Sequence, residues 1–368
     1  MPIVLILCVA GLLYWLQNWI YHRYWNKNLS VSVRFTDQFM FEGAATALTE
    51  TITNRKILPL PWIYVKFQIS RNGKVEHYRS DLFNILFYQR ITREIPFTFD
   101  KRGVYTIKGI DLLSHNLFIT SKMVQVIHMG DTLVVYPKLI DPQEYLIPYE
   151  KMMGDIATKR FLMEDPYMFK GIREYQPHDS FKSINFKASA REGKLLVNTH
   201  DATITQTIQI LLNMEKNNDH FNEVLYEQGI RMAASLASRY EEDGVPVSLY
   251  CNGQNVITHK EIGVAAGSGA NHIHTVMESL ASLEVSLPPL QSMGPHLERA
   301  TATREMDTYT VLISPYYGKE LQDAYKRLRS YTTSCMWILP VSYKDMTDAE
   351  FPPLRLREET EDVFLWEV

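Results

Sequence analysis

The sequence predicts a mixed fold: an N-terminal transmembrane helix, an antiparallel β-sandwich-like domain, and then a doubly wound α/β domain. Three observations lead to this prediction. Residues 3–21, "IVLILCVAGLLYWLQNWIY", carry no charge, apolar and polar residues alternate through 29–137, and strand patterns alternate with helix patterns over 203–342. With 368 residues, 46% hydrophobic and 22% charged, the chain is long enough for about two folded domains.

Residues 3–21 form the predicted membrane span, because a helix of that length is about 28 Å long, close to the thickness of a bilayer's hydrocarbon core. Aromatic residues gather at its far end, as in an interfacial belt: Trp15, Trp19, Tyr21, Tyr24 and Trp25. A cleaved signal peptide is the alternative, but the segment lacks a basic start and a small-residue cleavage site. Arg23 and Lys27 follow the span. The positive-inside rule therefore predicts a single-pass anchor over 1–25 in the cell membrane, with the C-terminal portion cytoplasmic.

The next domain, 29–137, consists of predicted strands. Period-two alternation recurs in "LSVSVRF", "WIYVKFQIS", "REIPFTF", "GVYTIKGIDLL" and "DTLVVYP". Turn residues stand at Asn72-Gly73, Lys101-Arg102-Gly103 and Met129-Gly130-Asp131, and no helical pattern intervenes. We expect six to eight short antiparallel strands, with exposed edges to which another chain can add a strand.

Residues 138–202 are predicted to be a connector. It contains "REYQPHDSFKSINFKASAR", residues 173–191, in which six charged side chains alternate with apolar ones. Asp179 is placed as the N-cap of a short helix over 180–191, and Gly193 as its left-handed C-terminal cap.

The α/β domain, 203–342, begins with an apolar strand at 205–214 and a helix over 223–242. Strand "VPVSLYC", helix "HIHTVMESLASLE", strand "TYTVLIS", helix "GKELQDAYKRLRSY" and strand "SCMWILPV" follow. This alternation predicts a mostly parallel sheet with helices on both faces. For the tail, 343–368, an edge strand and a mobile end are both left open.

The sequence lacks the residues that several classes of function require. The net charge of −4 argues against a broad nucleic-acid binder, and Cys8, Cys251 and Cys335 lie too far apart for a zinc ribbon or a disulfide framework. No phosphate-binding G-x-x-x-x-G-K-[ST] loop and no G-x-S-x-G elbow occurs. His272 and His274 would point apart on a helix.

The charged cluster at 173–191 has three readings: acid–base catalysis around Asp179 and Glu174, a phosphate site, or a buried ion-pair network. Catalysis needs carboxylates with displaced pKa values, whereas the neighbouring cations would hold these two ionised. We therefore predict a structural network that fixes one geometry and joins the two folded halves, with no catalytic residue.

The stretch "FKGIREYQPHDSFKSINFKASAREGKLLV" resembles the signature of the domain of unknown function 58 (DUF58) family. The matching residues are Gly171, Arg173, Tyr175, Pro177, Asp179, Ile184, Lys187, Ala188, Ala190 and Arg191. With "KRGVYTIKGIDLLSHNLF" and "LVVYPKL", the resemblance covers about 29–290. It implies a membrane-anchored β-domain followed by a von Willebrand factor A-like domain, often encoded beside MoxR-type AAA+ ATPases.

The chain departs from the family pattern at His178, where glycine is usual, and at Phe186, where tryptophan is frequent. A von Willebrand factor A domain that binds metal carries Asp-x-Ser-x-Ser after its first strand. Here Asn213, Glu215 and Asn217 have that spacing, and one carboxylate with two amides is a poor cage for Mg²⁺. We therefore expect no cofactor, with Mg²⁺ at these weak candidates as the alternative.

These expectations combine into a non-enzymatic membrane-anchored interaction protein. By resemblance, it would be an accessory partner of a MoxR-type ATPase in envelope or protein-complex maturation, with no nucleic-acid partner. The expected partner surface lies where parallel strands end, around 213–222 and 267–274. A metal-dependent (MIDAS-like) ligand-binding protein is the alternative, and a hydrolase or transferase is the third class.

Overall fold

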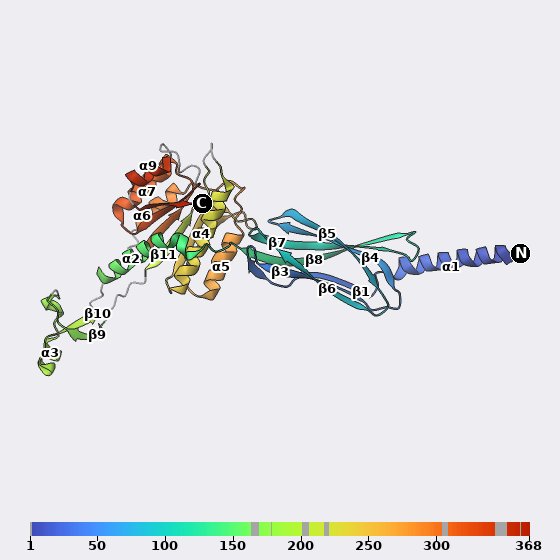
Figure 1. Cartoon of the computed structure of the whole chain (residues 1–368), viewed down its shortest axis with the longest axis horizontal. Helices are drawn as coiled ribbons and strands as arrows, with labels where there is room; N and C mark the ends of the chain where they lie inside the picture. Colours follow the sequence, from blue (N-terminus) through green and yellow to red (C-terminus); the bar gives the residue numbers. More distant parts are fainter. Residues whose placement is uncertain are drawn as a thin grey trace. The chain divides into compact units, whose positions relative to one another are not determined.

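The computed structural model describes residues 2–162, 169–177, 179–200, 206–216, 221–303, 308–342, 352–360 and 362–368 (Figure 1). The chain forms two compact units. The first comprises Met1–Lys138 with Val256–Thr258 and Met277–Glu284, and the second comprises Leu139–Asn255, His259–Val276 and Val285–Val368.

The first unit begins with helix α1, Pro2–Tyr24. Its window Ile3–Tyr24 is long and apolar enough to cross a membrane, and it is the one such helix in the described part of the chain. The large apolar side chains of its first half are exposed, such as Ile3 at 71% and Leu7 at 66%. A candidate N-terminal span was thus predictable from hydropathy alone.

Eight strands follow α1 in the first unit. They are β1 (Leu29–Phe35), β2 (Phe39–Phe41), β3 (Ala45–Asn54), β4 (Leu60–Arg71), β5 (Lys74–Ile85), β6 (Arg90–Thr98), β7 (Gly103–His115) and β8 (Lys122–Tyr136). Strands β1-β3-β6 form one sheet and β2-β8-β7-β4-β5 another. All pairings are antiparallel except β2 with β8. One core contains side chains of both sheets, among them Val33, Leu48, Ile63 and Ile107, each fully buried.

Two of the three predicted turns are present. Asn72 and Gly73 have φ values of 51° and 80° and connect β4 to β5, a conformation that Asn and Gly adopt most readily. Residues 101–102 lie between β6 and β7. The third prediction is wrong, because residues 129–131 lie inside β8. Asp131 is held there by a distant contact, since its carboxylate accepts a hydrogen bond from the backbone N–H of Phe35 at 2.6 Å.

The second unit contains a six-stranded sheet in the order β13-β12-β11-β14-β15-β16. Its strands are β11 (Thr207–Leu212), β12 (Val247–Gln254), β13 (Glu261–Gly267), β14 (Thr308–Ile313), β15 (Cys335–Val341) and β16 (Val363–Glu367). All neighbours are parallel except β12 and β13. The antiparallel β13 was not predicted, while the tail supplies β16 as an edge strand, which is one of the two outcomes left open.

Helices pack on both faces of this sheet. They are α4 (Glu223–Glu242), α6 (Gly294–Thr303), α7 (Lys319–Tyr331) and α9 (Pro352–Glu359), whereas α5 (Ala270–Ala281) is divided between the two units at Met277. Alternate residues of a strand face opposite sides. Leu212 and Ile313 face α4 at Gly229, whereas Leu211 and Leu312 join a core with α6 and α7. Helix α4 matches its predicted range, and α6 was not predicted.

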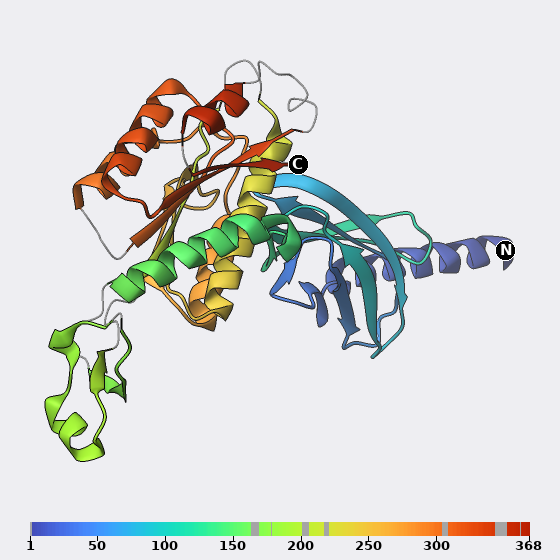
Figure 2. The same ribbon diagram turned by 60° about the vertical axis from the view of Figure 1, so that its left-hand side comes forward.

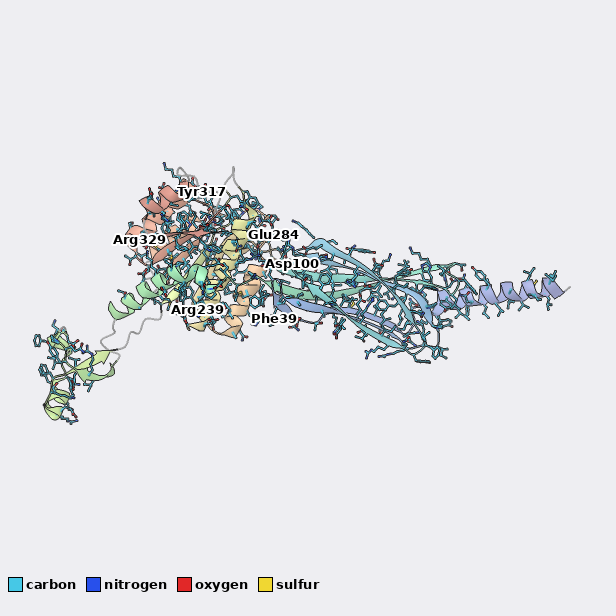
Figure 3. The ribbon with its side chains drawn as sticks, in the orientation of Figure 1. Phe39, Asp100, Arg239, Glu284, Tyr317 and Arg329 are labelled. Atoms are coloured by element: carbon cyan, nitrogen blue, oxygen red, sulfur yellow. The ribbon has the colours of Figure 1, made fainter. Side chains whose placement is uncertain are left out.

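The predicted connector contains a substantial helix. The 3₁₀ turn η1 (Pro142–Tyr145) leads into α2 (Leu146–Leu162), which lies beside α4 (Figure 2). Tyr149 of α2 stacks against Tyr240 of α4, with ring centroids 5.2 Å apart. The guanidinium of Arg239, labelled in Figure 3, lies 5.6 Å from the centroid of the Tyr149 ring. Helix α2 is therefore part of the second unit's packed structure.

Candidate functional site

The signature residues form a small module, defined here as residues 169–200 without residue 178. Strands β9 (Phe169–Glu174) and β10 (Leu196–His200) pair in antiparallel fashion, with the 3₁₀ turn η2 (Phe181–Ser183) and helix α3 (Phe186–Glu192) between them. Ile184 bridges to Val197 of β10, and both side chains are buried. The module thus has a minimal core of its own.

Arg173 and Asp179 join β9 to the turn that follows it. The Nη1 and Nη2 groups of Arg173 donate to Asp179 Oδ2 and Oδ1, at 2.6 Å each. The same carboxylate accepts a hydrogen bond from the Gln176 N–H at 2.8 Å. A bidentate contact of this kind pairs the two charges and also fixes the relative orientation of the two groups.

Two details differ from the sequence-based expectation for this cluster, and a third agrees with it. The cluster is not buried: the Arg173 side chain is 43% exposed, and Lys187 and Arg191 are exposed too. Asp179 is not a helix cap, because Asn185 caps α3 through the Ala188 N–H. Gly193 does end α3 with a φ of 68°, as predicted.

The Glu174 carboxylate pairs with Lys194, a residue outside the predicted set. The hydrogen bond from Lys194, reinforced by its charge, lowers the pKa of Glu174. Among the described residues no ion pair holds Lys187 or Arg191. The carboxylates at 174 and 179 are therefore arranged as anions that receive donors, which suits structure better than proton transfer.

The module exposes large apolar side chains. Phe181 is 74% exposed and Phe186 is 72% exposed, with Ile172 at 45% and Leu195 at 51%. The Phe181 ring contacts that of Tyr175, with centroids 5.9 Å apart. The exposed cations Lys182, Lys187 and Arg191 belong to the same turn and helix. We call Phe181, Phe186 and these three cations the aromatic–cationic face.

A second group of predicted site residues lies at the carboxyl edge of the six-stranded sheet, where β11, β12 and β14 end. Asn213 Nδ2 donates to Ser314 Oγ at 3.1 Å, and Asn213 Oδ1 accepts from Asn252 Nδ2 at 2.8 Å and from the Glu215 N–H at 3.0 Å. Asn252 Oδ1 in turn accepts from the Met214 N–H at 2.8 Å. Asn213, Asn252 and Ser314 are fully buried. Sequence reasoning missed Asn252, although it directly follows the predicted strand "VPVSLYC"; in the structure it lies inside β12.

The described residues at this edge do not fit a divalent cation. Mg²⁺ requires several oxygen ligands, preferably carboxylates, in near-octahedral geometry. The side-chain oxygen of Asn213 already receives two donors, and Glu215 Oε2 accepts from the Met293 N–H at 3.4 Å. Among the described residues no three His, Cys, Asp or Glu side chains gather closely enough to hold a metal. Asn217 lies outside the described residues.

The two histidines considered in the sequence have ordinary structural places. His272 hydrogen-bonds the Val247 carbonyl through Nε2 at 2.7 Å, and His274 lies on the same helix. Tyr250, His296 and Glu261 form a polar cluster that was not predicted from the sequence. The Tyr250 hydroxyl donates to Glu261 Oε2 at 2.9 Å and contacts His296 Nε2. Burial lowers the pKa of His296 and raises that of Tyr250.

Comparison with known proteins relates the second unit to a family. The family described as "Protein of unknown function DUF58" matches residues 171–362, which is just over half of the 368-residue chain. The uncharacterized protein YeaD of Bacillus subtilis is 20% identical over 212 residues, covering 56% of this chain and 52% of that protein. The chain therefore matches about half the length of this curated relative.

Two solved structures resemble a little under a third of the chain each. The CARDB domain of the PF1109 protein from Pyrococcus furiosus, in complex with di-metal ions, is 14% identical, covers 29% of this chain and 93% of its own, and has a TM-score of 0.20. The C-terminal domain of wzt is 8% identical, covers 30% and 75%, and has a TM-score of 0.25. Similarity at this level carries no argument about fold or function.

Proposed function

Because the chain belongs to the DUF58 family of proteins of unknown function, we propose that it is a membrane-anchored, non-enzymatic interaction protein that docks a partner on its aromatic–cationic face. The partner proposed is a MoxR-type AAA+ ATPase acting in envelope or protein-complex maturation. Helix α1 is proposed to be a single-pass anchor in the cell membrane. With Arg23 and Lys27 after the span, the remaining chain would be cytoplasmic.

One observation carries this proposal: the family signature forms a scaffold that displays apolar side chains to solvent. The family match begins at residue 171, inside the module, where Arg173 and Asp179 hold the turn before Phe181. Exposed phenylalanines, at 74% and 72%, are costly unless a partner covers them. Aromatic anchors surrounded by arginine and lysine are typical of interaction surfaces.

The carboxylates support a non-enzymatic role. Glu174 and Asp179 each receive a cationic donor, so neither is kept protonated for general-acid work. We also propose that the α/β domain is von Willebrand factor A-like, with a degenerate metal site. The sheet order with β11 at its centre, and the Asn213–Asn252–Ser314 amide network in place of a metal cage, support this proposal.

The test is binding of the purified full-length protein, in lipid nanodiscs, to the MoxR-type ATPase of the same organism. Phe181→Ser is expected to weaken binding at least about tenfold, because a central aromatic anchor contributes more than 1 kcal/mol. Tyr331→Ser is the matched control, since Tyr331 is 70% exposed at the end of α7 and is expected to leave binding unchanged. Equal affinities for both variants, or no saturable binding, would contradict the proposal. Saturable Mg²⁺ binding abolished by Glu215→Ala would favour the metal-dependent alternative.

A further inference from the structure

Helix α1 and the loop between β7 and β8 are joined by side-chain hydrogen bonds within the first unit. The Tyr14 hydroxyl donates to Thr120 Oγ1 at 2.9 Å, and Ser121 Oγ donates to Asn18 Oδ1 at 2.7 Å. The rings of Tyr14 and Phe118 have centroids 6.3 Å apart. The loop therefore runs back along the helix toward its N-terminus.

The position of Tyr14 along α1 determines how deep in the membrane the β7–β8 loop would lie. Tyr14 lies ten positions before the helix end at Tyr24, about 15 Å away at 1.5 Å per residue. If the span ended at Tyr14, the apolar helix from Ile3 would be only about 18 Å long, too short for a hydrocarbon core of about 30 Å. If the span continues to Tyr24, the loop around Thr120 lies at the level of the acyl chains.

The tip of this loop is apolar and exposed. Leu117, Phe118 and Ile119 are 48%, 65% and 55% exposed, and residues 116–121, "NLFITS", carry no charge. Two N–H groups near the tip are bonded inside the loop: the Asn116 side chain accepts from the Thr120 N–H at 2.8 Å, and the Ile119 N–H donates to the Asn116 carbonyl at 3.1 Å. Irregular backbone at membrane depth is tolerated where it is buried against protein, and the contacts of Thr120 and Ser121 with α1 supply part of that cover.

A second apolar loop lies at the same end of the sheet. Leu86, Phe87 and Tyr88, between β5 and β6, are 52%, 61% and 67% exposed. Their loop is held beside the end of α1, because the Tyr88 N–H donates to the Lys56 carbonyl and Lys56 Nζ donates to the Lys27 carbonyl at 2.8 Å. This loop is therefore at the level of the helix end, where an interfacial aromatic belt forms.

From these observations we infer that the first unit is seated in the lipid surface: the loop at 116–121 enters the acyl region beside α1, and the loop at 86–88 lies in the interface. The inference rests on the proposed anchor role of α1. It also explains the presence of Asn18 in the span, since Asn18 receives donors from Asn116 and Ser121 instead of facing lipid. The lipid bilayer is what covers the apolar side chains at the tips of these two loops.

Site-directed fluorescence on the full chain in phosphatidylcholine–phosphatidylglycerol vesicles tests this. Three proteins, each with one exposed cysteine, carry an environment-sensitive dye: native Cys8 in the anchor, Phe118→Cys at the loop tip, and Val75→Cys at the far end of β5, the latter two with Cys8→Ser. Cys8 is exposed, Val75 is 57% exposed, and Cys251 and Cys335 are buried. Brominated lipids are expected to quench the dye severalfold at positions 8 and 118 and not at 75, while aqueous iodide quenches only position 75.

The outcomes separate this inference from the anchor proposal. If position 8 is quenched by lipid but position 118 is quenched by iodide, the anchor stands and the inserted loop is wrong. If position 8 is not quenched by lipid, the anchor itself fails. Protection of position 118 from both quenchers that is lost on diluting the protein in lipid would assign the tip to a second copy and overturn the lipid contact. Leu117→Cys repeats the measurement if Phe118→Cys does not fold.

Discussion

Both terminal nitrogens of Arg173 donate to the carboxylate of Asp179 at 2.6 Å, across a turn whose Gln176 N–H donates to the same group. Asp179→Asn removes the charge and one of the acceptors. Because Arg173 is 43% exposed, we expect a loss of only about 1 kcal/mol, confined to the module. Hydrogen exchange should accelerate at the Gln176 amide, while the melting temperature of the α/β domain stays the same.

The control is Glu174→Gln, which removes a pair between two exposed side chains and should leave the Gln176 amide protected. A buried network joining folded halves would behave differently, since breaking one partner costs about 3–5 kcal/mol. A fall of several degrees in the melting temperature of Asp179→Asn would restore that interpretation.

Arg102 is expected to be far more important for stability. It is 3% exposed, and its Nη1 donates to the carbonyls of Leu280 and Leu283, at 2.7 Å and 2.8 Å, in a segment that belongs to the first unit. Close by, Asn72 Nδ2 donates to Glu284, labelled in Figure 3, at 2.8 Å. Arg102→Lys keeps the charge but replaces the planar fork with a single ammonium, and we expect a loss of about 2–3 kcal/mol in urea unfolding.

Lys101→Ala is the matched control for Arg102→Lys. It changes an exposed cation at the preceding position, so its effect on the free energy of unfolding should stay within about 0.5 kcal/mol. Equal effects of the two substitutions would show that the carbonyl contacts of Arg102 contribute nothing specific.

Sequence patterns predicted the elements whose information is local. The period of α4 and the Asn72-Gly73 turn both depend on residues close in the chain, and both were placed correctly. The Met129-Gly130-Asp131 triplet was misread because the Asp131 carboxylate is held by the N–H of Phe35, almost a hundred positions away. Turn propensity is a weak preference that one distant hydrogen bond can override.

The candidate site was harder to predict. The sequence identified the residues of the signature, but it did not predict their contacts or their exposure to solvent. Asp179 is a residue type that often caps helices. Its carboxylate instead pairs with Arg173 on the preceding strand, and Asn185 caps α3. Phe181 and Phe186 belong to the apolar residues of this stretch, a residue type that is usually buried, yet they are 74% and 72% exposed although the Phe181 ring contacts that of Tyr175. Burial depends on neighbours that are distant in sequence, which periodicity does not report.

Glu50 predicts an unusual pH dependence for the first unit. Its side chain is only 1% exposed, and burial with the neighbouring Asp81 charge raises its pKa from 4.5 to about 7, although Arg93 lies 3.3 Å away and acts in the opposite sense. The folded state therefore keeps a proton that the unfolded chain loses above pH 4.5. This contribution to stability is present below pH 4.5 and is lost as the pH rises through about 7.

Glu50→Gln mimics the protonated group at every pH. We expect it to stabilise the unit by up to about 3 kcal/mol at pH 8 and to have little effect near pH 4.5, measured by urea unfolding. Glu94→Gln on the neighbouring strand β6 is the control, because it makes the same chemical change at an exposed position. A Glu50→Gln protein that is less stable at pH 8 would mean that attraction by Arg93 outweighs burial.

His296 predicts that the stability of the second unit depends on pH in the opposite direction. Burial is the main cause that lowers its pKa below 6.5; Arg299 acts in the same direction and Glu261 opposes them. The unfolded chain then takes up a proton at a higher pH than the folded one, so stability is full above pH 6.5 and falls on acidification below it. His296→Gln should flatten this slope in melting temperatures recorded from pH 7.5 to 5.5, whereas His259→Asn, at an exposed position with φ 53°, should keep it. An unchanged slope in His296→Gln would place the acid sensitivity elsewhere in the unit.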